Sequence, residues 1–538
     1  MSGSKSVFLL LGAGLVGLMI IGLWPLRSNK FSIKFDEAKM LAKEQFLAEK
    51  PQLADITNLP NIILILADDL GFHDISLHGN TLIETPNIDA LALEGVNCTQ
   101  AYVTAPVCAP SRAGLITGRY QHRFGFENQM HQRLPRNRLE LLVARNFIKS
   151  YPWKIQKMKA VPKEADRRKQ GLPPTEITLA EILKKQGYAT AIIGKWHLGS
   201  YEYSLPHNRG FDEHYGFYQS HSLFAPEGSP GIVDMRNPAD WTDAYIWKGQ
   251  RKGECAIVRN GVEIEEPEYL TNSIAEEAIS FIELNKQQPF FLYLPFSAPH
   301  TPFQAPKSVY DQLEHIDDPV VRTYQAMIKV LDDAVGSIHD KVKTLGLEEN
   351  TLMFFLSDNG GATYTLATDN GPLNGGKITA FNGGLLVPFF VKWKGVLTEG
   401  KEYIKAVSAL DVFTTACTAA SVKLPDDRVY DGVNLIPYLN NEASGAPHSS
   451  LFWKAGRIRT ILHKDWKLIF DESGRQTLLY HLKTDPYEAR NLAENHPEVV
   501  SDLKRMHKNW YAQMPPALWP TIVTFSHEDA NGSYYFDN

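Results

Sequence analysis

Cysteine is scarce in this sequence, with four residues among 538. No two of them stand in a CxxC pattern, so neither a disulfide-stapled scaffold nor a Cys/His zinc site is predicted. An excess of one charge is also lacking, because 55 basic and 61 acidic side chains leave a net charge of -6. This balance gives no reason to expect a nucleic-acid partner. What remains is the composition of a globular protein whose length exceeds one ordinary domain.

A long apolar run without charged residues is present near the N-terminus. Residues 7–24 are 18 uncharged residues that follow Lys5. This length is at the lower limit for a bilayer-spanning helix, and no small-residue cleavage site follows it. We therefore predict an uncleaved signal anchor within residues 1–30, with a cleaved signal peptide as the alternative, and then a polar linker over residues 31–58. Either way we expect an exported protein, periplasmic or at the cell surface, and an uncleaved segment would anchor it in the membrane through residues 7–24.

Short apolar runs alternate with amphipathic helical patterns after this linker. Five runs are typical of buried strands because they are continuous rather than alternating: residues 61–69, 189–197, 289–300, 351–360 and 387–393. Helices are predicted between them, for example over residues 85–95 and 178–187. We predict an α/β fold with a large, mixed, mostly parallel sheet sandwiched by helices over residues 59–444. A small C-terminal α+β subdomain is expected over residues 445–538.

A basic segment interrupts this alternation at residues 133–170. From Arg133 to Lys169 it contains twelve Lys and Arg residues against three acidic ones, together with scattered apolar side chains. It is interpreted as an insertion that is partly amphipathic. A solvated surface excursion, a contact for a polyanionic substrate and a contact for a membrane surface all remain open.

Four of the five predicted strands end in polar, reactive side chains. In parallel sheets the site gathers beyond the carboxyl ends of the strands. Two acidic pairs, Asp68-Asp69 and Asp358-Asn359, offer oxygen ligands for a hard divalent cation, calcium or magnesium. The remaining candidates are donors to a tetrahedral oxyanion or acids for its leaving group, namely Lys195, His197, His300 and Lys377.

Cys108 stands in the stretch VCAPSRAGLITGRY. A thiolate nucleophile would need a histidine base and an electropositive pocket, and no histidine lies beside Cys108 in the sequence. The flanking Pro110 and Ser111 favour a junction between a loop and a helix, where the helix N-terminus attracts anions. A buried thiol, a nucleophile and the precursor of a modified residue therefore stay open on these residues alone.

The stretch CAPSRAGLITGR resembles the Cys-x-Pro-Ser-Arg signature of type I sulfatases, the formylglycine-dependent members of the alkaline phosphatase superfamily. Ordered similarity extends from about residue 61 to 491 and includes NIILILADDLG, GKWHLG, FFLSDNGG and LYHLKTDPYEARNLA. The resemblance implies an alkaline-phosphatase-like fold and a sulfuric ester hydrolase. It further implies that a separate maturation enzyme converts Cys108 to formylglycine (3-oxoalanine), on which a sulfo-enzyme intermediate forms.

The same resemblance implies roles for the residues that match the family's motifs. One calcium ion would be bound by Asp68, Asp69, Asp358, Asn359 and the modified Cys108. Arg112 would hold the hydrated formylglycine, and the sulfate oxygens would be bound by Lys195, His197, His300 and Lys377. Two positions depart from the family pattern, because Asn382 and Leu386 stand where many members carry glutamate and arginine.

Three functions are weighed on this basis. The first is a sulfatase whose substrate, given the basic insertion, is a sulfated polysaccharide or oligosaccharide. The second is a phosphoester or phosphonate hydrolase of the same superfamily. The third is a membrane-anchored binding protein that has lost catalysis, which the retained reactive residues argue against.

Overall fold

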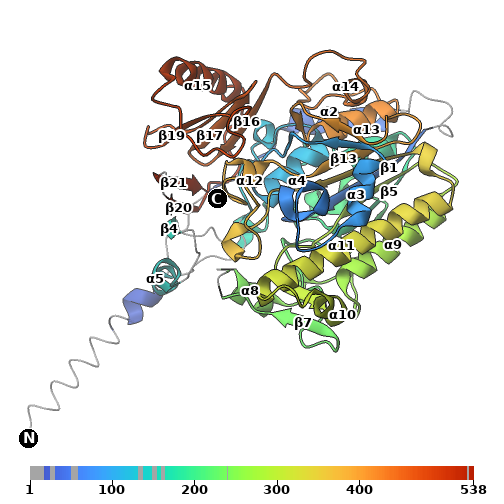
Figure 1. Cartoon of the computed structure of the whole chain (residues 1–538), viewed down its shortest axis with the longest axis horizontal. Coiled ribbons are helices and arrows are strands. Elements are labelled where there is room, and N and C mark those ends of the chain that lie inside the picture. Colours follow the sequence, from blue (N-terminus) through green and yellow to red (C-terminus); the bar gives the residue numbers. More distant parts are fainter. Residues whose placement is uncertain are drawn as a thin grey trace, which may run out of the picture.

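A ten-stranded sheet forms the centre of the protein (Figure 1). The computed structural model describes residues 17, 19–24, 31–49, 59–130, 137–147, 154–158, 164–238, 240, 242–529 and 532–537. In spatial order the strands of this sheet are β14 (Lys401–Tyr403), β2 (Val96–Cys98), β13 (Phe389–Lys392), β12 (Thr351–Ser357), β1 (Asn61–Ala67), β10 (Phe290–Pro295), β5 (Ala189–Lys195), β6 (Glu213–Phe217), β8 (Val258–Arg259) and β9 (Val262–Glu263). The run from β12 to β6 is parallel, whereas β13 pairs antiparallel with both of its neighbours.

Helices cover both faces of this sheet (Figure 1). Successive side chains of β1 enter two different cores, as the alternation along a strand requires. Ile62 and Leu64 share one core with α4 (Cys108–Thr117), α7 (Leu179–Lys185) and α13 (Asp411–Ala419). Ile63 and Ile65 share the other with α3 (Pro86–Leu93), α9 (Leu270–Asn285) and α11 (Pro319–Thr344). The predicted fold class, a mixed and mostly parallel sheet sandwiched by helices, is confirmed.

All five apolar runs singled out in the sequence form strands of this sheet, namely β1, β5, β10, β12 and β13. Each is fully or almost fully buried, which explains why its sequence shows no polar alternation. The two helical patterns correspond to α3 and α7. Helix α7 begins with a capping box between Thr178 and Glu181, and the chain turns at Gly187 with a φ of +99°.

Small antiparallel sheets lie at the C-terminal end of the chain. Strands β16 (Ser450–Ala455), β17 (Ile458–His463), β18 (Trp466–Asp471) and β19 (Thr477–His481) form a four-stranded sheet in chain order, against which α15 (Pro497–Tyr511) packs. A hairpin of β20 (Val523–Asp529) and β21 (Gly532–Asp537) follows. The exact boundary of a subdomain at residue 445 stays a prediction.

The basic insertion supplies a strand to that hairpin. Its described parts are α5 (Arg138–Phe147), β4 (Lys154–Met158) and α6 (Glu164–Arg167). Strand β4 pairs antiparallel with β20, so residues 154–158 are built into the C-terminal sheet. Residues 133–136, 148–153 and 159–163 lie outside the described part of the chain.

The N-terminal segment is described only in part. Of the predicted anchor, residues 17 and 19–24 are described, and no helix among the described residues is long and apolar enough to cross a membrane. Part of the segment interpreted as a linker is helical, as α2 (Glu37–Ala48). The buried Lys43 of α2 donates from Nζ to Glu181 Oε1 of α7 at 2.5 Å and to the Glu176 carbonyl at 2.8 Å.

Candidate active site

The two acidic pairs predicted at strand ends lie side by side. Strands β1 and β12 are parallel neighbours with Ala67 opposite Ser357, so the residues that follow both strands leave the same edge of the sheet. The Asp358 amide donates to the Ala67 carbonyl at 3.1 Å, and the Asp69 amide donates to Asp358 Oδ1 at 3.3 Å. The structure therefore brings Asp68, Asp69, Asp358 and Asn359 together.

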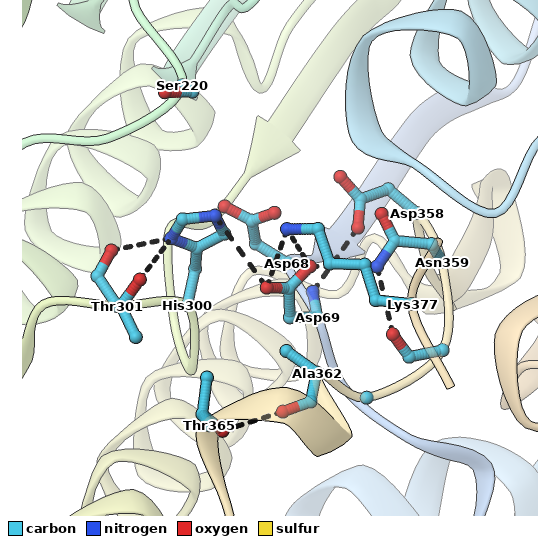
Figure 2. A network of polar contacts seen from close by, with 12 residues as sticks. Asp68, Asp69, Ser220, His300, Thr301, Asp358, Asn359, Ala362, Thr365 and Lys377 are labelled. Carbon is cyan, nitrogen blue, oxygen red and sulfur yellow. Dashed lines mark hydrogen bonds and ion pairs between the residues drawn. The ribbon is translucent and has the colours of Figure 1, made fainter. Parts of the chain in front are cut away.

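Strands β5 and β10 bring two basic side chains, Lys195 and His300, to the same place. Lys195, the last residue of β5, donates from Nζ to Asp68 Oδ2 at 2.5 Å. His300 follows β10, and its Nε2 lies 3.6 Å from Asp69 Oδ2 (Figure 2). The other ring nitrogen, Nδ1, lies 2.5 Å from the Thr301 carbonyl and so carries the hydrogen in that contact. This leaves Nε2 facing the carboxylate.

Lys377 approaches the same carboxylate from a different segment. Its Nζ lies 2.8 Å from the Asp69 carboxylate, and Asn359 Nδ2 donates to Asp69 Oδ1 at 2.8 Å (Figure 2). The Lys377 amide donates to the Gly361 carbonyl at 2.9 Å, which ties its backbone to the loop after β12. Asp69 is therefore the carboxylate shared by Lys377, His300 and Asn359.

Arg112 lies beneath these groups, on α4. It is completely buried, and its Nε donates to Asp358 Oδ2 at 2.8 Å while Nη1 donates to the Lys195 carbonyl at 3.0 Å. Nη2 lies 3.4 Å from Asp68 Oδ1. Burial alone would lower the pKa of this guanidinium, but the Asp358 and Asp68 carboxylates outweigh it and raise the pKa. Arg112 thus joins the two acidic pairs.

Cys108 is the first residue of α4 and is 1% exposed. One ligand atom from each of Asp68, Asp69, Cys108 and His300 can be chosen so that all lie within 4.8 Å of one another. Burial raises the pKa of the Cys108 thiol to about 12, against the lowering effect of Lys195 and Lys377. A thiol with this pKa is protonated at neutral pH, so a thiolate nucleophile is not favoured. A buried thiol and the precursor of a modified residue remain.

The donor set at the strand ends fits a hard divalent cation. Three carboxylates and one amide oxygen meet there, and Asp68 Oδ1 and Asn359 Oδ1 are buried without a hydrogen bond among the described residues. Burial raises the pKa of Asp358 to about 6, and Asp68 adds to this effect, whereas Arg112 opposes it. A cation would satisfy both orphan oxygens and favour the ionised carboxylates, and oxygen ligands of this kind suit calcium.

The outermost charges of the site favour an anion. Burial would raise the pKa of Asp69, but Lys377 and His300 lower it to about 2. Burial, followed by the charge of Lys377, lowers the pKa of His300 to about 3, so His300 is neutral at pH 7 without a ligand. Burial would lower the pKa of Lys377, but Asp69 raises it well above its usual value, so Lys377 stays charged. A stable cation beside a neutral imidazole suits oxyanion binding.

His197 lies two residues after β5 and is fully buried. Burial lowers its pKa well below the usual value, and the positive charges of Lys195 and Arg112 lower it further. Its backbone has a φ of +52°, in the left-handed region that a non-glycine residue seldom adopts. The structure therefore places all six predicted catalytic residues and all five predicted ligands in one cluster.

Residues that support this cluster from behind were not found in the sequence. Asp74 accepts from Tyr324 Oη at 2.6 Å, from the Gly71 amide at 2.8 Å and from Thr368 Oγ1 at 2.8 Å. Tyr324 Oη also lies 3.2 Å from the Asp69 carbonyl, so Asp74 fixes the loop after β1. Their signal in the sequence is a lone aspartate and a helical tyrosine, which no spacing links.

Comparison with known proteins gives consistent matches. The sequence model of the sulfatase family matches residues 60–422. The chain is 34% identical over 384 residues to N-acetylgalactosamine-6-sulfatase of Mus musculus, a match that covers 70% of this chain and 66% of that protein. It is 32% identical over 451 residues to steryl-sulfatase of Rattus norvegicus, which covers 73% and 72%. The chain thus spans about two thirds of the length of these curated relatives.

Solved structures show the same fold. Ps i-CgsB in complex with k-i-k-neocarrahexaose gives a TM-score of 0.71 at 29% identity, covering 86% of this chain and 95% of that one. The phosphonate monoester hydrolase of Agrobacterium radiobacter gives a TM-score of 0.57 at 20% identity, covering 88% and 99%. At that identity the second likeness concerns the fold alone.

Proposed function

The chain belongs to the sulfatase family, and we propose that it hydrolyses sulfate esters through a formylglycine made from Cys108. The position of Cys108 carries this proposal. Its thiol begins α4 beside carboxylates and fixed cations, and burial keeps it protonated. A hydrated aldehyde at this position would find both a cation site and hydrogen-bond donors. Conversion requires a separate formylglycine-generating enzyme. We also propose that the protein is exported, with residues 7–24 as its signal anchor.

The chain's own residues divide the work of such a site. Hydrated formylglycine at position 108 would supply the attacking hydroxyl, and a calcium ion held by Asp68, Asp69, Asp358 and Asn359 would supply positive charge to the sulfate oxygens. Lys377 keeps its charge beside Asp69 and binds sulfate oxygens.

His300 is suited to move a proton. It is neutral without a ligand, and an anionic sulfate ester next to it would raise its pKa, because an opposite charge favours imidazolium. Substrate binding would therefore load His300 with a proton that it can pass to the leaving oxygen. Lys195, another cation of the cluster, already forms an ion pair with Asp68 at 2.5 Å.

A sulfated carbohydrate is the proposed substrate class. Two similar proteins support it by name, N-acetylgalactosamine-6-sulfatase and Ps i-CgsB in complex with k-i-k-neocarrahexaose. The basic insertion supports it through charge, since its described exposed side chains include Arg138, Arg168 and Lys169. The likeness to steryl-sulfatase shows that family membership does not by itself select a sugar.

Mass spectrometry of the Cys108 peptide, together with kinetics on matched substrates, tests the reaction. We expect the peptide of mature protein to carry formylglycine, and an aryl sulfate to be turned over much faster than the matching aryl phosphate. Cys108→Ser removes the residue that is converted and should abolish turnover, whereas Cys417→Ala, a change at another buried cysteine, should not. A strong preference for the phosphate, or full activity of Cys108→Ser, would refute the proposal.

The substrate class needs its own test. Because β4 pairs with β20, deleting the insertion would remove a paired strand, so charge substitutions are preferable. Changing Arg138, Arg168 and Lys169 to Gln should raise KM for a sulfated polysaccharide and leave KM for an aryl sulfate unchanged. The exposed Lys423→Gln is the matched surface control. An equal KM for the polymer in both variants would argue against a polyanion contact in the insertion.

A further inference from the structure

The turn that carries Lys377 is strained. We call residues 374–384 the Lys377 turn. Within it Ile378 has a φ of +82°, and a β-branched residue is a genuine outlier in this region. Its amide donates at 2.8 Å to the carbonyl of Pro106, two residues before Cys108. Such a backbone persists only where surrounding contacts over-determine it, and strain of this kind gathers at functional sites.

A buried ion pair from the C-terminal part of the chain, Lys467 with Glu488, forms hydrogen bonds to this turn. Glu488 Oε2 accepts from the Asn382 amide at 2.6 Å, at the first residue of the short helix α12 (Asn382–Leu385). Lys467 of β18 lies 2.7 Å from Glu488 Oε1 and donates to Asn382 Oδ1 at 2.8 Å. The Asn374 amide side chain also lies 3.4 Å from the Glu488 carbonyl, so both ends of the Lys377 turn contact Glu488.

This ion pair is a costly way to join two parts of a protein. The side chains of Lys467 and Glu488 are 0% exposed. Burial lowers the pKa of Lys467 and raises that of Glu488, so each carries a desolvation penalty even though the partner opposes the shift. An apolar pair of similar volume is often as stable, or more so, and fixes no particular hydrogen-bond geometry. The pair therefore calls for a reason other than stability.

Asn382 suggests that reason. Its backbone amide donates to Glu488 Oε2 at 2.6 Å, so a carboxylate from another segment of the chain lies at the start of α12. Lys467 then bridges both residues. Two charged side chains from the C-terminal part of the chain thus meet at the base of the turn that presents Lys377 to Asp69.

We propose that Lys467 and Glu488 are positioning residues that hold the strained Lys377 turn, and through it the Lys377 ammonium group, in place at the active site. The inference rests on the proposed sulfate-binding role of Lys377. It makes the C-terminal sheet a working part of the site, although Lys467 and Glu488 touch neither Asp69 nor Cys108 in any contact that the described residues show.

A matched pair elsewhere provides the control. Lys454 of β16 forms a buried ion pair with Glu127, which also joins the C-terminal sheet to the main domain but lies outside the Lys377 turn. If both pairs serve stability alone, Lys467→Met and Lys454→Met should lower Tm and leave kcat/KM of the folded enzyme unchanged. If positioning is correct, Lys467→Met and Glu488→Gln should also lower kcat/KM about 10²-fold, the effect of an ångström-scale misplacement.

Two further variants separate position from stability. The double change Lys467→Met with Glu488→Met removes both buried charges, so it should keep Tm near that of the wild type and still lower kcat/KM. Adding Asn382→Asp to Glu488→Gln returns a carboxylate to within reach of Lys467 and should recover part of kcat/KM. Normal kcat/KM in the double variant, or an equal loss in Lys454→Met, would overturn the proposal.

Binding of inorganic sulfate, measured by calorimetry, keeps this proposal distinct from the proposed function. If the wild type binds sulfate but hydrolyses no sulfate ester, the proposed function fails, while weaker sulfate binding by Glu488→Gln still supports positioning. If the wild type hydrolyses sulfate esters, and Glu488→Gln binds sulfate and turns over substrate as well as the wild type does, the positioning proposal fails while the proposed function stands. If the wild type neither binds nor hydrolyses, both fail.

Discussion

The active site has an inner half and an outer half that differ in access to solvent. The inner half is Asp68 with Arg112 and Lys195, all 0% exposed, and the outer half is Asp69 with His300 and Lys377, which are 3–7% exposed. Each half has one carboxylate between two basic side chains. The inner charges hold one another and leave Asp68 Oδ1 for the proposed cation, whereas the outer ones are placed to exchange contacts with a substrate. Two adjacent aspartates thus serve different purposes.

The two halves differ in the hydrogen-bond partners of their side chains as well as in the exposure of those side chains. Arg112 is bonded to Asp358 and lies near Asp68, so it links two strand ends as a structural tie. His300 is held through Nδ1 by a backbone carbonyl, which leaves Nε2 free to take or give a proton next to Asp69. Substitutions in the inner half should therefore damage folding and activity together, and those in the outer half mainly activity.

The largest effect is expected for Arg112→Met. It leaves the buried Asp358 and Asp68 without their shared cation, and breaking a buried pair in this way costs about 3–5 kcal/mol. We expect a large drop in the unfolding free energy, measured by urea denaturation, together with loss of aryl sulfate turnover. Calcium should restore part of the stability, because it supplies a cation to the same carboxylates. If Arg112→Met had the same unfolding free energy as the wild type in the absence of calcium, Arg112 would not be what holds the inner half together.

Lys377→Met should have a smaller effect on stability and a clear one on rate. Removing one preorganised donor to an oxyanion typically lowers turnover about 10²–10³-fold. Asp69 keeps Asn359 and His300 as neighbours, so its carboxylate is not left without a partner as that of Asp358 is in Arg112→Met. Stopped or steady-state assays with an aryl sulfate measure the turnover rate, and urea denaturation measures the unfolding free energy. A stability loss as large as that of Arg112→Met would erase the distinction between the two halves.

Much of this site could be predicted from the sequence, because the residues stand at the ends of continuous apolar runs. Parallel strands place such ends along one edge of the sheet, so the strand pattern alone is enough to group Asp68, Asp358, Lys195 and His300. The division into two halves could not be predicted, since Asp68 and Asp69 are adjacent in sequence. Which carboxylate meets which cation depends on side-chain direction and on the left-handed backbone of Asp69, with a φ of +64°.

The residues that support the site from other segments could not be predicted from the sequence, for a related reason. Glu488 reaches the Lys377 turn from a C-terminal segment, and Tyr324 reaches the Asp69 loop from α11. No periodicity or motif spacing encodes contacts between residues so far apart. The departure at Asn382 was visible in the sequence, but the contact of Asn382 with Glu488 is a tertiary contact that only the fold reveals.

The smallest expected effect concerns pH, and it distinguishes the outer half through His300. The folded-state pKa of about 3 lies below the usual value of 6.5, because burial and then Lys377 disfavour imidazolium. Below pH 6.5 the unfolded chain therefore binds a proton that the folded chain refuses, and stability falls as the pH falls towards 3. Between pH 7 and 5 this amounts to at most about 2 kcal/mol, at 1.36 kcal/mol for each pH unit.

His300→Asn should remove that part of the slope when urea denaturation is repeated at both pH values. Lys377→Met should remove less of it, because burial of His300 remains after the charge is gone. An unchanged slope in His300→Asn would show that the folded site does not lower the pKa of His300, and the imidazole would then take up its proton between pH 7 and 5 without a substrate.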